Sequence, residues 1–362
     1  MTTKIKHLYI HVPFCKTICS YCDFCHEVYK EDVADKWLNR LAKDFKRINN
    51  EEYETIYIGG GTPSSLSIDQ LKKLLELIKP FSNKVIEYTF EVNPESINED
   101  KILLLKEYGI NRVSIGLQSS SDKLLKLMNR HHNFNDVKNT IELFRRHQID
   151  NISLDIIYSL PTQTMEDLRN TLDDVLSLNV PHISLYSLTI EKGTIFDRLG
   201  YKTLDEDVEA DMYEYIEKEF IKHDYVHYEI ANFAKEGYES KHNLGYWNYD
   251  DYRGISCGAT GKYDHKRFVE TRDIRKYINE DETVEIEEIP LKEEAFENII
   301  MSLRTIHGLD IKLFNERYGI DFIKEYKSAI ENNKDNLLFD NDYCKCKNLE
   351  ILNSILLDFM QY

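Results

Sequence analysis

Three cysteines near the N-terminus have the spacing of a metal-cluster site. Cys15, Cys19 and Cys22 form a C-x3-C-x2-C motif directly after a short apolar segment. A cubane iron–sulfur cluster held by cysteine normally takes four thiolates, one for each iron. A compact set of three therefore predicts a [4Fe-4S] cluster in which one iron stays open for another ligand.

Zinc binding and disulfide bonding are the two alternative uses of these cysteines. Zinc sites usually complete a C-x2-C pair with a second pair or with histidines further along the chain. No second pair follows here at that distance. Seven cysteines in 362 residues, without a secretory leader, are typical of a reduced intracellular chain. Both alternatives are therefore less favoured than the cluster.

Composition and charge narrow the class of protein. The chain has 46 Lys and Arg residues against 64 Asp and Glu residues, a net charge of -18, which repels phosphate backbones. No apolar run approaches the roughly 18 residues of a membrane helix, and the N-terminus lacks the long apolar stretch of a signal peptide. We therefore expect a folded cytoplasmic protein with no nucleic-acid partner and no membrane span.

Apolar segments with the pattern of strands alternate with helical segments of period 3.6. The expected strands are residues 7–12, 55–58, 88–92, 112–118, 153–158 and 182–188. The first helix is expected at residues 31–47, and the second begins at a capping box formed by Ser67 and Gln70. Because eight strand–helix units close the usual barrel, six units predict an α/β fold with a partial (β/α)6 barrel of the TIM type. Its functional groups should lie at the C-terminal ends of the strands.

A glycine-rich turn follows the second expected strand directly. Gly59, Gly60 and Gly61 precede Thr62 and Pro63. Glycines let a backbone approach a ligand without an intervening Cβ, so that N–H and C=O groups form the binding surface. The turn lacks the Lys-Ser/Thr that ends a Walker phosphate loop. It is therefore a candidate binding segment for another kind of ligand.

Polar residues interrupt three of the apolar strands. Glu91, Gln118 and Asp155 each lie inside or at the end of such a strand. A carboxylate in that position costs several kcal/mol unless it is paired or binds a ligand. One such residue could belong to a buried salt bridge, but three on successive strand ends indicate a shared pocket.

Five motifs in this order resemble the radical S-adenosylmethionine (SAM) enzymes. They are the cysteine motif after Y-I-H-V-P-F, then G-G-G-T-P, E-V-N-P-E-S, V-S-I-G-L-Q-S and S-L-D-I-I-Y-S-L-P. More narrowly, the chain is similar to the family of oxygen-independent coproporphyrinogen III oxidases, which includes a haem-chaperone subgroup of the HemW type. The resemblance runs from about Tyr9 to about Gly308 and covers most of the chain.

The resemblance implies the cofactors and most of the site. In such proteins the open iron of the cluster binds the amino and carboxylate groups of SAM, and one electron cleaves SAM to methionine and a 5'-deoxyadenosyl radical. An electron donor for the cluster is therefore an implied partner, and no catalytic residue is assigned beyond the cluster and SAM site. Arg130 suits a carboxylate through its planar fork. The matching SAM positions are Tyr9, Tyr21, Gly60, Gly61, Thr62, Glu91, Gln118, Arg130 and Asp155.

The position two residues after the third cysteine separates the oxidase from the haem chaperone. The oxidase has a fourth cysteine there and a long N-terminal extension. Phe24 occupies that position here, and 14 residues precede Cys15. Both differences favour the chaperone. Cys25, one residue later, is either a spare thiol near the cluster or an unliganded loop cysteine.

The segment H-N-L-G-Y-W, residues 242–247, matches the H-N-x-x-Y-W signature of the chaperone subgroup. His242 could bind haem iron, and Tyr246 and Trp247 offer flat surfaces for a porphyrin. A histidine beside aromatic residues is, however, more often a packed structural residue than a ligand. His11, near the cluster strand, is a second candidate ligand.

The remainder of the chain divides into a connecting segment, residues 231–290, and a C-terminal domain, residues 291–362, after a core of residues 1–230. In the connecting segment Cys257 is expected to be a buried, inert thiol, and residues 279–289 to be a solvated acidic connector. The C-terminal part resembles the family's small winged-helix-like domain. Its 9 basic and 13 acidic residues argue against DNA binding and favour a cover or docking role. Cys344 and Cys346 are expected to be ordinary surface or semi-buried cysteines.

Three functions follow from these features. The favoured one is a haem chaperone that binds haem and delivers it to a client protein. The alternative is oxidative decarboxylation of coproporphyrinogen III to protoporphyrinogen IX, which Phe24 disfavours. The third is a radical SAM enzyme acting on another substrate.

Overall fold

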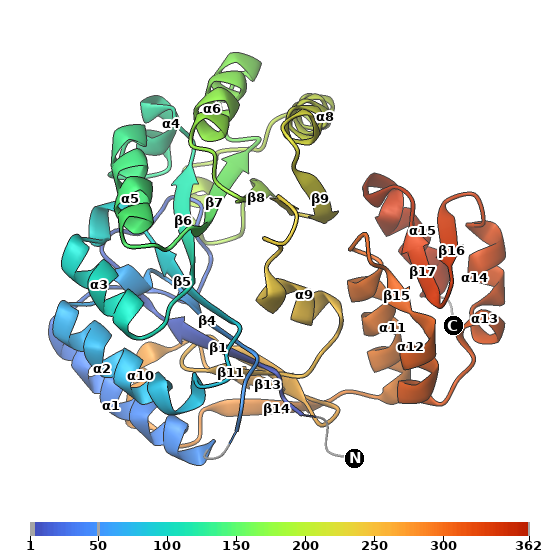
Figure 1. The fold of residues 1–362 in the computed structure, drawn as a ribbon, viewed down its shortest axis with the longest axis horizontal. Coiled ribbons are helices and arrows are strands. Elements are labelled where there is room, and N and C mark those ends of the chain that lie inside the picture. Colours follow the sequence, from blue (N-terminus) through green and yellow to red (C-terminus); the bar gives the residue numbers. More distant parts are fainter. Residues whose placement is uncertain (1–3, 49–50, 361–362) are drawn as a thin grey trace.

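The computed structural model describes residues 4–48 and 51–360. Its main part is a twelve-stranded sheet in the order β14-β13-β12-β11-β1-β4-β5-β6-β7-β8-β10-β9, and a smaller domain follows it in the chain (Figure 1). Within the described residues, no helix combines the length and the apolar character needed to cross a bilayer.

The central strands of the sheet are parallel and adjacent, as the alternation of strand and helix patterns predicted. They are β1 (His7–Val12), β4 (Thr55–Gly60), β5 (Glu87–Val92), β6 (Arg112–Gln118), β7 (Asn151–Tyr158) and β8 (His182–Ser187). Because β1 and β8 each pair with a further strand on the other side, this parallel sheet stays open. The predicted α/β class with a parallel sheet is thus confirmed.

Helices follow the parallel strands in the chain and cover the outer side of the sheet (Figure 1). They are α1 (Glu31–Arg47), α2 (Ile68–Ile78), α3 (Glu99–Glu107), α4 (Asp122–Leu127), α5 (Phe134–Arg146), α6 (Met165–Ser177), α7 (Ile195–Arg198) and α8 (Glu206–Lys222). Helix α1 buries Trp37, Leu41 and Phe45 against the sheet, because its apolar residues recur on one face. The capping box of Ser67 and Gln70 at the start of α2 is present as predicted.

The segment after α8 extends both edges of the sheet. Its elements are β9 (Val226–Glu229), β10 (Asn232–Ala234), α9 (Lys241–Trp247), β11 (Tyr252–Ile255), β12 (Thr260–Tyr263), β13 (Lys266–Glu270), α10 (Ile274–Asn279) and β14 (Val284–Glu288). The prediction of an acidic connector at residues 279–289 is wrong in part, because β14 is an exposed edge strand paired with β13. Val284 and Ile286 alternate there with glutamates, a pattern of period two, and the charges protect the open edge from further pairing.

The C-terminal domain has its own apolar core and a three-stranded sheet in the order β15-β17-β16. Its elements are α11 (Leu291–Ser302), β15 (Leu309–Asp310), α12 (Ile311–Tyr318), α13 (Phe322–Glu325), α14 (Lys327–Asn332), β16 (Leu337–Asp340), β17 (Tyr343–Cys346) and α15 (Leu352–Phe359). Cys346 is partly buried as expected, whereas Cys344 is fully buried. The surface prediction for Cys344 was wrong because it occupies the inward position of strand β17, packed in the domain core.

Candidate cofactor site

The three cysteines of the motif lie on a loop that is closed at its base and held at its tip. At the base, β2 (Phe14–Cys15) pairs in parallel with β3 (Glu27–Val28). At the tip, the backbone N–H of Ser20 donates to the carbonyl of Met128 at 3.0 Å, and its carbonyl accepts from Phe196 at 2.9 Å. The loop therefore presents its cysteines at the C-terminal ends of the strands, as predicted.

Each thiol of the motif has a different polar neighbour. The hydroxyl of Thr62 donates to Sγ of Cys15 at 3.5 Å, and the guanidinium of Arg130 donates to Sγ of Cys19 at 3.5 Å. Sγ of Cys22 lies 3.6 Å from Nδ1 of His26. Among residues 4–48 and 51–360, no group of three or more His, Cys, Asp or Glu side chains is arranged to hold one metal ion. A cubane cluster takes one ligand for each iron, so three thiolates from this loop would leave the fourth iron to another ligand.

Burial keeps two of these thiols protonated when no iron is bound. It raises the pKa of Cys15 to about 11 and the pKa of Cys22 to about 12. Only the thiolate is a metal ligand, so iron binding must displace these protons.

The glycine turn, which begins with the last two residues of β4, is required by close packing on both sides. A Cβ at Gly59 would lie 2.7 Å from Oε1 of Glu91, and a Cβ at Gly61 would lie 3.0 Å from Sγ of Cys15. Gly60 has φ of +115°, a conformation that residues with a side chain rarely adopt. The turn thus brings bare backbone between the cysteine loop and Glu91.

Glu91, at the end of β5, faces the cavity beside this turn. Its carboxylate accepts hydrogen bonds from the hydroxyl of Tyr57 at 2.8 Å and from the N–H of Gly60 at 3.0 Å. Burial, followed by repulsion from Asp155, raises its pKa to about 7. A cation bound here would relieve both effects.

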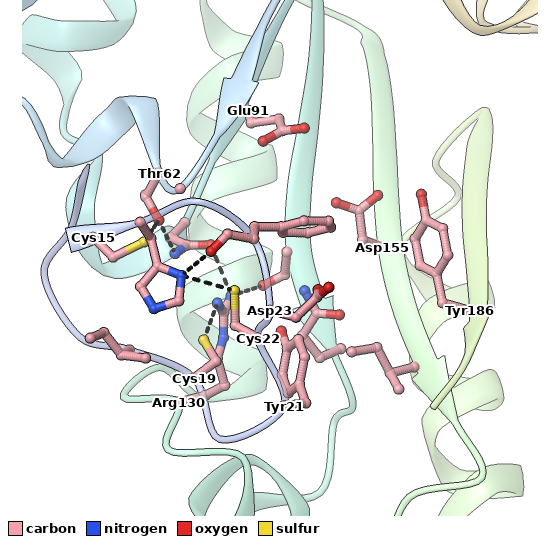
Figure 2. A pocket seen from close by; sticks show the side chains of 18 of the residues that line it. Cys15, Cys19, Tyr21, Cys22, Asp23, Thr62, Glu91, Arg130, Asp155 and Tyr186 are labelled. Atoms are coloured by element: carbon pink, nitrogen blue, oxygen red, sulfur yellow. Dashed lines mark hydrogen bonds between the residues drawn. The ribbon is translucent and has the colours of Figure 1, made fainter. Parts of the chain in front are cut away.

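Asp155 projects from β7 into the same cavity. Its Oδ1 accepts a hydrogen bond from the hydroxyl of Ser114 at 2.9 Å. Burial raises the pKa of Asp155 to about 6. Glu91 and Asp155 lie on separate strands above the cysteine loop (Figure 2), so they form two acidic positions for a ligand that carries positive charge.

Arg130 contributes a cation on the opposite side of the cavity. Its Nη2 donates to Oδ1 of Asn93 and to the carbonyl of Gly116, both at 2.9 Å. Its Nε is buried and has no hydrogen-bond partner among the described residues. A buried donor without an acceptor is costly, which points to an anionic or carbonyl group of a ligand at this position.

Gln118 reaches the cavity through a local irregularity of β6. The register between β6 and β7 shifts between Gly116 and Gln118, and Gln118 has φ of +66°. Such a bulge turns the side chain away from the regular alternation and is frequent beside functional sites. Gln118 is the last residue of β6 and is buried.

These groups surround a cavity of about 410 Å³ (Figure 2). The donor set fits both implied cofactors, since thiols suit iron, the free Nε of Arg130 suits a carboxylate, and the two acids suit the sulfonium charge and the ribose hydroxyls of SAM. The predicted residues that line it are Cys15, Cys19, Tyr21, Cys22, Gly60, Gly61, Thr62, Glu91, Gln118, Arg130 and Asp155.

Tyr9 is the one predicted SAM residue that lies outside this lining. Its hydroxyl hydrogen-bonds to Nδ1 of His11 at 2.9 Å, and the His11 ring occupies the space where a Cβ of Gly60 would be. Tyr9 and His11 are two residues apart on β1, so they share one face of the strand. In this structure the Tyr9 hydroxyl faces His11, which packs against the glycine turn, and the position of Tyr9 beside the cluster and SAM stays a prediction.

The residues predicted for haem are also outside the cavity. His242 is buried on α9, with Nδ1 2.6 Å from the hydroxyl of Thr55 and Nε2 2.8 Å from the hydroxyl of Tyr246. Burial holds the pKa of His242 well below its usual range, so the ring is neutral. His11 likewise has both ring nitrogens in hydrogen bonds, the second to the carbonyl of Cys25 at 2.8 Å. Haem ligation by His242 and porphyrin packing on Tyr246 and Trp247 stay predictions.

The sequence reasoning missed several residues that line or support the cavity. Asn93 joins the hydroxyl of Thr62, at 3.0 Å, to Arg130. Ser114 holds Asp155, and Tyr186 and Glu191 line the far side. Asn93 and Tyr186 lie at or just beyond strand ends, so the rule that located Glu91 could have found them.

Comparison with known proteins places this site in a family. Residues 9–175 match the Radical SAM superfamily. The chain is 35% identical to the haem chaperone HemW of Lactococcus lactis, over 99% of this chain and 98% of that protein. It is 38% identical to HemW of Bacillus subtilis, over 87% of each. The fold is shared with Escherichia coli coproporphyrinogen III oxidase, HemN, a radical SAM enzyme, at a TM-score of 0.86 and 18% identity, covering 99% of this chain and 90% of that one.

Proposed function

Because this chain belongs to the HemW family of radical SAM proteins, we propose that it is a haem chaperone, which binds a [4Fe-4S] cluster, SAM and haem and delivers haem to client proteins. The observation that carries the proposal is the similarity to HemW of Lactococcus lactis at 35% identity over 99% of the chain. The presence of Phe24 in place of a fourth cysteine supports it, since this exposed side chain offers no thiol.

In this proposal Cys15, Cys19 and Cys22 hold the cluster, and the cavity beside them holds SAM. When bound, the cluster supplies one electron for the reductive cleavage of SAM. The free Nε of Arg130 would bind the carboxylate of SAM, and the glycine turn would offer its backbone to the methionine end. The surrounding side chains orient SAM and keep water from it.

The charge of the cavity favours SAM over a substrate with several carboxylates. Coproporphyrinogen III carries four propionates, and an oxidase would need cationic partners for them. Arg130 is the one Lys or Arg among the described lining residues, and it is already bound to Asn93 and Gly116. Four acidic residues line the same cavity: Asp23, Glu91, Asp155 and Glu191. This balance supports the chaperone over the oxidase.

Haem binding by His242 would require its hydrogen bond to Tyr246 to open, because iron needs a free ring nitrogen. His307 offers a contrast within the same chain. It lines a cavity of about 520 Å³ between α9 and the C-terminal domain, and its side chain makes no hydrogen bond within the described part of the chain. The two histidines therefore serve as matched positions in a haem titration.

The proposal also extends to the barrel type of the core and to the type of the C-terminal domain. We infer that the parallel strands form a partial (β/α)6 barrel and that residues 291–362 form a winged-helix-like domain. The order helix, strand, three helices and β16–β17 hairpin supports this domain type. Its net acidic charge supports a role in covering the site or docking a client.

An anaerobic haem titration of the cluster-reconstituted chain tests the proposed function. A saturable Soret band is expected, together with no protoporphyrinogen IX when coproporphyrinogen III, SAM and a reductant are supplied instead. His242→Ala should weaken or shift the band, whereas His307→Ala should leave it unchanged. Conversion of coproporphyrinogen III would refute the chaperone function. A Soret band that weakens in His307→Ala but not in His242→Ala would assign haem ligation to His307 instead of His242.

A further inference from the structure

Two cysteines outside the cofactor site lie next to each other, although 232 residues separate them in the chain. Cys25 follows the cluster motif, and Cys257 follows β11. Their sulfur atoms are 3.5 Å apart, and both are free thiols. Neither thiol lines the cluster and SAM cavity.

The surrounding backbone holds the two sulfurs together. Sγ of Cys25 lies 3.2 Å from the carbonyl oxygen of Arg272, and Sγ of Cys257 lies 3.1 Å from the carbonyl oxygen of Thr271. A Cβ on Gly258 would lie 2.4 Å from Cβ of Cys25, so only glycine allows this approach. Two neighbouring carbonyls and a glycine thus hold the two thiols side by side.

The two thiols differ in access. Cys25 lines a surface cavity of about 340 Å³ and is 8% exposed, whereas Cys257 is 0% exposed. A hydrogen bond from Cys257 lowers the pKa of Cys25, and the same sharing raises the pKa of Cys257. Cys25 is therefore placed to attack a small molecule from solvent, and Cys257 is placed to attack Cys25 afterwards.

We propose that Cys25 and Cys257 form a reversible disulfide by exchange with a low-molecular-weight disulfide, and that this bond fastens the cluster loop to the turn after β11. The Cys25 thiolate attacks one sulfur of the small disulfide, forms a mixed disulfide and releases one small thiolate. Cys257 loses its proton to that thiolate, attacks Cys25 and releases the second small thiolate. The two protein thiols lose two electrons and two protons, and the small disulfide gains them as two thiols.

The geometry requires only a local movement for this step. A disulfide has a sulfur–sulfur distance of about 2.05 Å, so the two sulfurs must approach by roughly 1.5 Å. Cys25 lies on the cluster loop three positions after Cys22, while Cys257 lies in the turn that connects β11 to β12 of the sheet. The bond would therefore restrain the loop that carries the cluster ligands and slow the loss of iron from it.

Disulfide mapping of the cluster-loaded, full-length chain tests this proposal. The protein is incubated anaerobically with oxidised glutathione, blocked with N-ethylmaleimide, digested without reductant and analysed by mass spectrometry. We expect a cross-link between the peptide of residues 17–30 and the peptide of residues 254–262, reversible by dithiothreitol, with the absorption near 400 nm retained. The linked protein should also lose iron to a chelator several-fold more slowly.

Three variants make the test specific. Cys25→Ser and Cys257→Ser should each abolish the cross-link while the cluster absorption remains, and Cys346→Ser should leave both unchanged. A cross-link that persists in Cys25→Ser would assign the bond to Cys19 or Cys22 and overturn the proposal. A stable glutathione adduct on Cys25 without the cross-link would overturn it as well, and unchanged iron loss would overturn the fastening of the loop.

Discussion

The buried carboxylate of Glu91 makes the folded protein less stable than it would be with a neutral side chain. The pKa of Glu91 is about 7 in the folded protein and 4.5 ordinarily. A pKa difference of one corresponds to about 1.4 kcal/mol, so ionised Glu91 costs about 3 kcal/mol of folding free energy. Burial and the facing Asp155 are the physical causes, and both act on the charged form.

The sign of this effect sets its pH dependence. Below pH 4.5 the carboxyl is protonated in both states and costs nothing. As the pH rises from 4.5 to 7 the unfolded chain ionises first, so stability falls, and above pH 7 the full cost is present. Glu91→Gln removes the charge but loses about 1 kcal/mol from one hydrogen bond, since Tyr57 and Gly60 both donate to the present carboxylate.

We therefore expect Glu91→Gln to stabilise the cluster-free, SAM-free chain by about 2 kcal/mol at pH 8 and by close to zero at pH 5. Urea unfolding at both pH values, without oxygen, measures this difference. The exposed Glu107→Gln is the matched control and should change neither value. If the free energies of unfolding of the variant and the parent differed by the same amount at both pH values, the reasoning would be refuted. A variant less stable than the parent at pH 8 would refute it as well.

Three further predictions concern the cofactors. Cys19→Ala should abolish the broad cluster absorption near 400 nm after reconstitution, whereas Cys346→Ala should keep it; a cluster that persists would mean that the ligands are assigned wrongly. Arg130→Lys should weaken SAM binding by at least tenfold in equilibrium dialysis, because lysine lacks the buried Nε, and unchanged affinity would contradict that role. Tyr246→Phe should strengthen the Soret band in a haem titration, because it frees Nε2 of His242, and a weaker band would argue against His242 as the ligand.

Local patterns in the sequence were sufficient for the parallel sheet and for most of the cavity. The residues at strand ends could be located because the C-terminal ends of parallel strands meet at one edge, and Glu91 and Asp155 both follow this rule. The cysteine loop could be proposed as a cluster site from spacing alone, since its three cysteines are close in sequence.

The features that were missed depend on contacts between distant segments. Strand β11 lies beside β1, and this pairing joins segments that no local pattern relates. The same pairing brings Cys257 to Cys25, which the sequence presented as two unrelated thiols. The two hydrogen bonds of His242 likewise depend on Thr55 from β4 and on the position of α9.

The transfer of haem to an acceptor tests the central claim most directly. The chain is loaded with its cluster and with haem, separated from free haem, and mixed anaerobically with a haem-free b-type cytochrome whose spectrum differs from that of the loaded chain. Haem-loaded serum albumin provides the comparison for passive release. The proposed function predicts that haem passes to the cytochrome faster from this chain than from albumin. Transfer no faster than from albumin, or haem that stays on the chain, would contradict it.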